Sequence, residues 1–171
     1  MERDRWSRYP LPGRERHRNP FLRSAAGVRV LSVLQKPFFA FLPPTGFGVL
    51  ATTGRKTGEM RRTPVRAVRR ENKAYLVAIG GGRNAWLKNI EANPNVHLRI
   101  RGGTFSGLAR QLRGEAETRD ALGAYCETVN WFDYFECAIW RKGRPRRSKI
   151  TDLHLTWFAQ GVPVVIDLAD D

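Results

Sequence analysis

The sequence is poor in the residues that build metal centres and disulfide frameworks. It contains only two cysteines, Cys126 and Cys137, and three histidines that stand far apart. Neither a zinc site nor a disulfide framework is therefore indicated, and both thiols are expected to be buried in a reducing compartment. We expect no metal, and none of the histidines, His17, His97 and His154, is assigned to catalysis.

Acidic residues and long apolar runs are also scarce. The chain has 16 Asp and Glu against 30 Lys and Arg, a formal net charge of +14, so we expect an anionic partner: nucleic acid, an acidic membrane surface or a polyanionic cofactor. Arg29 and Lys36 interrupt the most apolar N-terminal run, which leaves no charge-free membrane span. The first twenty residues are polar and do not fit a signal peptide, so a cytoplasmic location is expected.

The chain length fits one domain with an N-terminal extension. Residues 1–20 mix charges with prolines and predict a disordered basic arm, followed by a single domain over residues 21–171. From Phe21 to Leu42 apolar residues recur densely with basic residues between them, which predicts an amphipathic helix. This helix is expected to cover one side of the domain, or else to lie peripherally on an anionic membrane surface.

The stretch from Gly46 to Val68 organises the rest of the chain. An apolar, β-rich run breaks at Gly54 and Gly58 and then resumes, which predicts a β-hairpin with a glycine-bounded tip, GRKTG. Glycines allow backbone N–H groups to turn outward into an anion nest, and the Arg, Lys and Thr side chains add charge and donors. The tip therefore suits a phosphate or carboxylate, with a solvated charged turn as the alternative. Its spacing does not match a P-loop.

Short strand-like runs and helical patterns alternate through the remaining sequence. Strands are predicted at 74–80, 96–101, 104–113, 153–158 and 162–168. Helices are predicted at 85–92 and across 115–140. The basic run 141–149 is expected to stay solvated unless an anion orders it. Six or seven short strands with two or three helices indicate an α+β fold, an antiparallel barrel with helices packed outside.

Three motifs point to a known family. They are LATTGRKTGEMRRTPV, GGGRNAWLKNIEANPNV and the closing PVVIDL, which span roughly residues 46–168. Together they resemble the deazaflavin-dependent nitroreductase family, a branch of the split-barrel flavin and deazaflavin oxidoreductases. The resemblance implies a split β-barrel of the FMN-binding type. It also implies an enzyme that binds reduced coenzyme F420 and passes a hydride to an organic acceptor such as a quinone or nitroaromatic. Because such a cofactor carries the hard chemistry, no catalytic triad or metal is needed.

The resemblance also implies roles for single residues. The cofactor-binding positions fall on Arg55, Lys56, Thr57, Arg61, Pro64, Ala78, Ile79, Gly80, Gly81, Trp86 and Asn89. A planar acceptor would suit walls built from Trp131, Tyr134 and Phe135. Tyr134 is the candidate to donate a proton or a hydrogen bond to the reduced product. Well-known members have a serine and a lysine where this chain has Ile79 and Gly80.

Other functions remain open at this point. An FMN-dependent split-barrel reductase or oxidase would also need a phosphate site, although FMN has no polyglutamate tail to use several arginines. A basic nucleic-acid-binding barrel would use the net charge, but one compact cationic tip and strands without a row of exposed aromatics argue against it. Barrels of this class often pair, so a homodimer also remains open.

Overall fold

The computed structural model describes residues 43–79, 81–141 and 143–169. The predicted N-terminal arm and the amphipathic helix over 21–42 lie outside the described residues, and so does Gly80. No helix among the described residues is long and apolar enough to span a membrane. The same part of the chain holds no group of three or more His, Cys, Asp and Glu side chains that could bind a metal.

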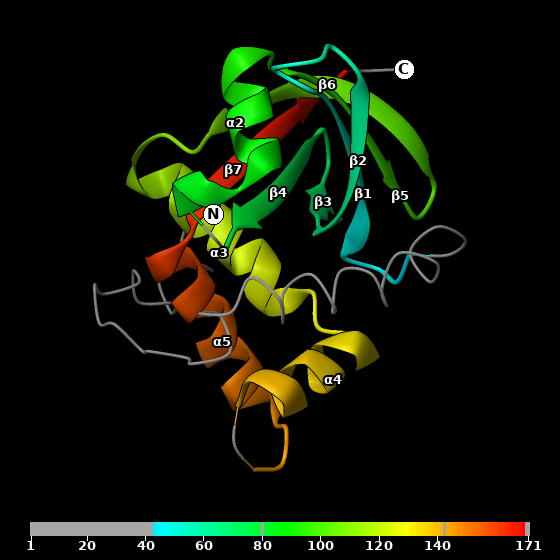
Figure 1. Ribbon diagram of the computed structural model, residues 1–171. Helices are drawn as coiled ribbons and strands as arrows, with labels where there is room; N and C mark the ends of the chain where they lie inside the picture. The colour runs from blue at the N-terminus through cyan, green and yellow to red at the C-terminus, as the bar shows by residue number, and fades with distance from the viewer. Residues whose placement is uncertain (1–42, 80, 142, 170–171) are drawn as a thin grey trace.

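One curled, antiparallel sheet of seven strands forms the centre of the structure (Figure 1). The strands are β1 (Phe47–Thr53), β2 (Met60–Arg66), β3 (Val68–Arg70), β4 (Lys73–Ala78), β5 (Asn95–Ile100), β6 (Gly103–Gln111) and β7 (Val162–Leu168). Their order in the sheet is β2-β1-β5-β6-β7-β4-β3. The hairpin over 46–68 is confirmed, with Leu50 of β1 opposite Thr63 of β2. The predicted antiparallel barrel is thereby confirmed as a half-barrel sheet.

Helices cover the sheet on both faces. Besides the short 3₁₀ turn η2 (Gly81–Arg83), the described residues form α2 (Ala85–Ala92), α3 (Gly114–Glu127), α4 (Trp131–Trp140) and α5 (Arg147–Gln160). One core joins α2 to the concave side of the sheet, and a second joins α3 and α5 to the other side. In Figure 1, α2 stands beside the β1–β2 turn, whereas α4 and α5 form the opposite end of the molecule.

The alternation in β5 shows how the sequence selects these faces. Val96 and Leu98 are buried, whereas His97 and Arg99 between them are exposed, as the period of two requires. Burying a side chain the size of leucine contributes roughly 1.5–3 kcal/mol, so the register of β5 against its neighbours is strongly specified. This prediction is confirmed.

The strand predicted at 153–158 is wrong, because these residues lie within α5. The buried residues of α5 recur at Ile150, Leu153, His154, Trp157 and Phe158, which is the spacing of one helix face. A six-residue window is too short to separate this pattern from strand alternation. The helix extends back to Arg147 and so takes in the end of the basic run that was expected to be a loop.

The single helical pattern predicted across 115–140 is divided into α3 and α4. Asn130 caps α4: its side chain accepts from the backbone N–H groups of Phe132 and Asp133, and the Asp133 carboxylate accepts from the Asn130 N–H. This reciprocal capping box starts a new helix at Trp131. Together with α5, this division gives four α-helices among the described residues, more than the two or three predicted.

Candidate active site

The GRKTG tip is a tight turn closed by its own backbone. The N–H of Gly54 donates to the carbonyl of Glu59 at 2.7 Å, and the N–H groups of Thr57 and Gly58 donate to the carbonyl of Gly54 at 3.2 and 2.7 Å. The N–H of Glu59 donates to the Thr57 hydroxyl at 3.3 Å. These donors point into the turn, so the predicted nest of outward N–H groups is wrong for them.

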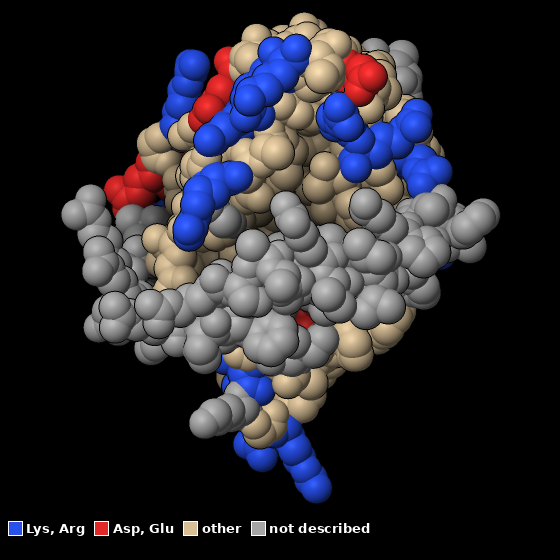
Figure 2. Space-filling view, viewed as in Figure 1, with Lys and Arg blue, Asp and Glu red and all other residues tan. Residues whose placement is uncertain are grey.

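The positive charge of the tip is therefore presented by side chains. Arg55, Lys56, Arg61 and Arg62 are all exposed there. Arg61 forms an exposed ion pair of 2.8 Å with Glu59, which is worth little in water. Figure 2 shows Lys and Arg side chains gathered on both sides of the end of the molecule that carries the tip. Such a cluster attracts a polyanion through charge-assisted hydrogen bonds.

A buried amide connects this tip to α2. The side chain of Asn89 is 5% exposed, and its Oδ1 accepts from the backbone N and from Nη1 of Arg55, each at 3.3 Å. Its Nδ2 donates to the hydroxyl of buried Thr52 at 3.0 Å. Two sequence-predicted site residues, Arg55 and Asn89, are thus brought into direct contact, while Thr52 was missed.

Other predicted cofactor-binding residues face the core. Trp86 and Ala78 are buried in the concave core of the sheet, and Ile79 packs against the core beneath α3 and α5. Pro64 lies opposite Val49 on the edge strand β2, where its missing N–H leaves no ladder bond unmade. A ligand beside these residues would therefore contact their backbone or the edges of their side chains.

The loop before α2 leaves room for a flat group. Gly81 has φ of 57°, which glycine adopts readily, and a Cβ added at Gly81 or Gly82 would meet nothing within 4 Å. A side chain could fill this space, so the glycines keep it free for a close approach by a ligand. The exposed cations of the tip and this open loop together fit a cofactor with an anionic tail and a planar ring.

The aromatic residues predicted to hold the acceptor lie on an exposed face of α4. Trp131, Tyr134 and Phe135 are 62%, 40% and 52% exposed. Phe132 on the same helix packs edge-on against Phe47, the first residue of β1, with ring centroids 4.9 Å apart. The tip follows the other end of β1, and seven residues of strand span roughly 20 Å. The aromatic face and the cationic tip thus lie at opposite ends of one hairpin (Figure 1).

A buried ionic cluster anchors α4 and was missed by the sequence analysis. Arg66 of β2 forms an ion pair with Asp133, and both side chains are almost fully buried. The Arg66 guanidinium also donates to the carbonyl of Thr128 at 2.6 Å and lies over the rings of Phe47 and Tyr125. The spacing of Asn130 and Asp133 was the available signal, because it matches a capping box.

Burial sets the protonation states in this cluster. It lowers the pKa of fully buried His154 to about 4, helped by the nearby Arg66 charge, so the imidazole is neutral at pH 7. Burial raises the pKa of Glu136 to about 7 despite Arg66. For Asp133, burial is outweighed by the ring of His154, whose Nε2 lies 3.6 Å from Oδ1, and by the Arg66 charge, and the pKa of its carboxyl falls below the usual value.

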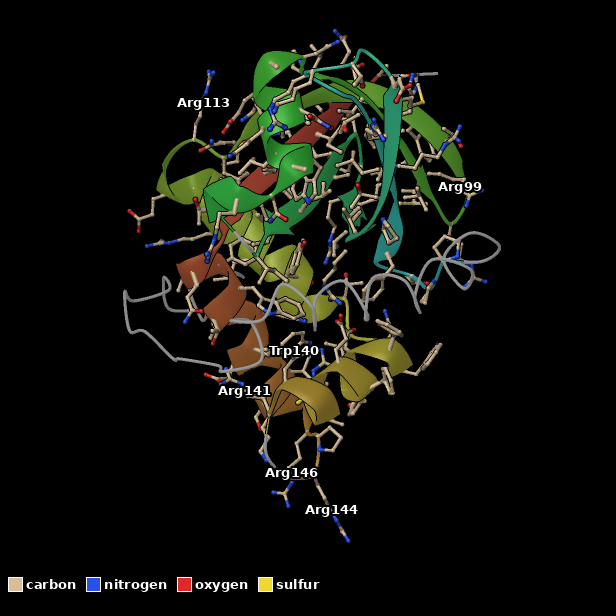
Figure 3. The ribbon with its side chains drawn as sticks, viewed as in Figure 1. Arg99, Arg113, Trp140, Arg141, Arg144 and Arg146 are labelled. Atoms are coloured by element: carbon tan, nitrogen blue, oxygen red, sulfur yellow. The ribbon has the colours of Figure 1, made fainter. Side chains whose placement is uncertain are left out.

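The basic run after α4 is partly built into the fold. Arg141 pairs with Asp152 at 2.7 Å and donates to the Thr156 hydroxyl at 2.8 Å. Arg144 and Arg146 are exposed and point away from the body of the protein at the end farthest from the tip (Figure 3). These two residues fit the predicted solvated loop, whereas Arg141 does not.

Comparison with solved structures shows the fold. A structure described as a domain-swapped dimer is 21% identical, with a TM-score of 0.50, over 82% of this chain and 93% of that one. The heme storage protein HutZ from Vibrio cholerae is 14% identical, with a TM-score of 0.50, over 82% and 92%. A structure described as an F420-H2 dependent reductase is 24% identical, with a TM-score of 0.46, over 72% and 94%. The split-barrel fold class is confirmed.

The sequence also matches a family model. The match covers residues 40–139, more than half of the chain, and the family is described as F420H(2)-dependent quinone reductase. The matched segment contains the tip, the glycine loop, α2 and the aromatic residues of α4. The chain therefore belongs to the F420H2-dependent quinone reductase family and is an oxidoreductase whose cofactor is coenzyme F420.

Proposed function

We propose that the tip binds the phosphate and polyglutamate tail of F420, and that the aromatic face of α4 receives a planar, apolar acceptor of the quinone class. When bound, the reduced deazaflavin supplies the hydride. The observation behind this proposal is the group of exposed cations at the tip, where Glu59 is the one acidic side chain within the turn. A tail of several carboxylates matches this charge, whereas FMN offers one phosphate.

In this proposal the tip residues divide the work of holding the tail. Arg55, Lys56 and Arg61 supply charge and donors from exposed side chains, and the Thr57 hydroxyl, which accepts a backbone N–H, keeps a hydrogen to donate. Pro64 stiffens β2 behind them. The cations stand on a short turn between two paired strands, so the backbone that carries them loses little conformational freedom on binding.

The ring is proposed to lie against the loop between β4 and α2. Ala78, Ile79 and Gly81 offer backbone to its edge, because the first two direct their side chains into the core and Gly81 has none. Gly80 is assigned to the same loop from the sequence. Trp86 supports the loop from beneath, inside the core. Close approach to the backbone would exclude water from that edge of the ring.

The acceptor is proposed to stack on Trp131, Tyr134 and Phe135. Exposed aromatic side chains bind flat apolar rings well. The Tyr134 hydroxyl would donate to an oxygen of the reduced product. A nitroaromatic ring would satisfy the same surface, so the family description is what favours a quinone.

Assembly and location are further parts of the proposal. A homodimer is proposed because the solved structure described as a domain-swapped dimer shares the fold; light scattering of the purified chain at several concentrations tests it.

A peripheral membrane contact would involve residues 21–42, which lie outside the described residues. Flotation of the full-length chain with anionic vesicles tests this contact, and protein that stays entirely in the soluble fraction would rule it out.

The test of tail binding is a titration with oxidised F420, with FMN as the comparison ligand. We expect micromolar or tighter binding of F420, and Lys56→Ala should weaken it by about 1–3 kcal/mol because a charge-assisted contact is lost. The matched control is Arg144→Ala, which removes one exposed cation at the opposite end of the molecule. Equal weakening by both variants would mean that the tip attracts the cofactor only through the net charge of the protein and does not bind its tail directly. Tighter binding of FMN than of F420 would contradict the cofactor assignment.

A further inference from the structure

Thr52, Asn89 and Arg55 form a continuous chain of hydrogen bonds from the core to the tip, here called the amide clamp. We propose that the amide clamp makes Asn89 a positioning residue: it holds Arg55 in place and so sets the preference of this enzyme for a deazaflavin with an anionic tail over one without. This inference rests on the proposed function of the tip. It assigns Asn89 an action through Arg55, where the family resemblance implied a contact with the cofactor.

The hydrogen-bond partners of Asn89 are compatible with only one orientation of its side-chain amide. Its Oδ1 faces two donors of Arg55, the backbone N and Nη1. A flipped amide would direct its own N–H₂ group against both donors. In the observed orientation Nδ2 donates to Thr52, whose hydroxyl fixes the amide from the core side. Thr52 therefore determines how the tip is held, although it lies before the tip in β1.

Burial separates the clamp from the cofactor. Thr52 is 1% exposed and Asn89 is 5% exposed, so neither offers more than a trace of surface to a ligand. Both acceptor positions of Asn89 Oδ1 are used by Arg55. Arg55 alone of the three is exposed. Thr52 and Asn89 therefore act on tail binding indirectly, and the contact that reaches the tail is that of Arg55.

The clamp matters because an exposed arginine is otherwise mobile. Fixing a free arginine side chain costs conformational entropy, because many rotamers are reduced to one. The clamp restricts the Arg55 side chain already in the folded protein, so less conformational entropy is lost when a tail binds. More of the electrostatic attraction then contributes to the affinity. A deazaflavin without phosphate and tail makes no use of Arg55, so its affinity should not depend on the clamp. The clamp thus acts on specificity, the difference between two affinities.

The position of α2 adds a second consequence. Asn89 lies on α2, which begins just after the open glycine loop at Gly81–Gly82. The same hydrogen bonds that hold Arg55 also hold α2 against the hairpin. The clamp thereby keeps the tail site and the loop proposed for the ring at a constant separation, as a cofactor that spans both requires.

The experiment compares two probes, F420 with its polyglutamate tail and the deazaflavin riboside without phosphate or tail. Dissociation constants are measured for the wild type, Thr52→Val, Asn89→Ala, Arg55→Ala and the double variant Thr52→Val/Arg55→Ala. Thr52→Val should weaken F420 binding about 3- to 10-fold, and Arg55→Ala about 10- to 100-fold. The double variant should match Arg55→Ala within about twofold, because both changes remove one coupled interaction. The tailless probe should bind all variants alike, and KM for F420H2 should rise with little change in kcat.

Controls separate the clamp from the tip proposal and from misfolding. Thr52→Val keeps the side-chain shape, and a cooperative thermal unfolding transition shows that the fold is retained even where Asn89→Ala fails to fold. Lys56→Ala lies outside the clamp, so its effect should add to that of Thr52→Val. Equal weakening of both probes, additive effects of Thr52 and Arg55, or a Thr52→Val enzyme with full tail preference would overturn the clamp. If the wild type bound both probes equally, the proposal that the tip binds the tail would itself be wrong.

Discussion

At the scale of single residues, the buried cluster around Arg66 makes stability depend on pH. Glu136 titrates at about 7 in the folded protein and near 4.5 when exposed, so between these values the folded state holds a proton that the unfolded state has lost. This group therefore destabilises the fold as pH rises from about 4.5 to 7. His154 acts in the opposite direction, because its folded pKa of about 4 lies below 6.5 and stability is lost as pH falls through that window.

The glutamate contribution can be removed with one substitution. We predict that Glu136→Gln gains stability relative to the wild type as pH rises from about 4.5 to 7, by up to about 3 kcal/mol, and that the gain then levels off. Urea unfolding at pH 5, 6, 7 and 8 measures it. The control is Glu59→Gln, an exposed acid at the tip, whose difference from the wild type should stay small. A pH-independent difference for Glu136→Gln would contradict the raised pKa.

At the scale of elements, the capping box decides where α4 begins. Asn130 accepts two backbone N–H groups, and its Nδ2 donates to the carbonyl of Thr45 before β1. We predict that Asn130→Ala lowers the free energy of unfolding by about 1–2 kcal/mol, since a helix cap of this kind is lost. The matched control is Arg113→Ala, because Arg113 is the N-cap of α3 and makes no side-chain cap bond. Similar losses for both variants in urea unfolding would mean that the cap contributes nothing specific.

At the scale of the whole molecule, the net charge of +14 governs how the cofactor is attracted. The tip cations are exposed and therefore screened by salt, with a Debye length of about 10 Å at 0.1 M and about 3 Å at 1 M. We predict that raising the salt concentration from 0.05 to 0.5 M weakens F420 binding about tenfold or more, while the tailless deazaflavin is hardly affected. Isothermal titration measures both. Equal salt dependence of the two ligands would show that the tail is not bound by exposed charge.

The sequence by itself determined the features that depend on local rules. The hairpin tip, the strand alternation of β5 and the bounds of α2 follow from glycine positions, a period of two and a helix flanked by Asn84 and Asn93. The family motifs added the cofactor, which no local rule could name. The helix at 147–160 was misjudged because short apolar windows do not separate helix from strand until their packing partners are known.

Only the tertiary structure decided which distant residues meet. Arg66 reaches Asp133 across 67 positions, and Asn89 reaches Arg55 across 34, because the curled sheet brings α4 and α2 to opposite ends of one hairpin. The direction of the tip N–H groups also depends on tertiary structure. The N–H groups of Gly54, Thr57 and Gly58 donate to backbone carbonyls within the turn and therefore do not point outward. Hydrogen bonds and ion pairs of this kind depend on the placement of whole elements, which local sequence patterns do not specify.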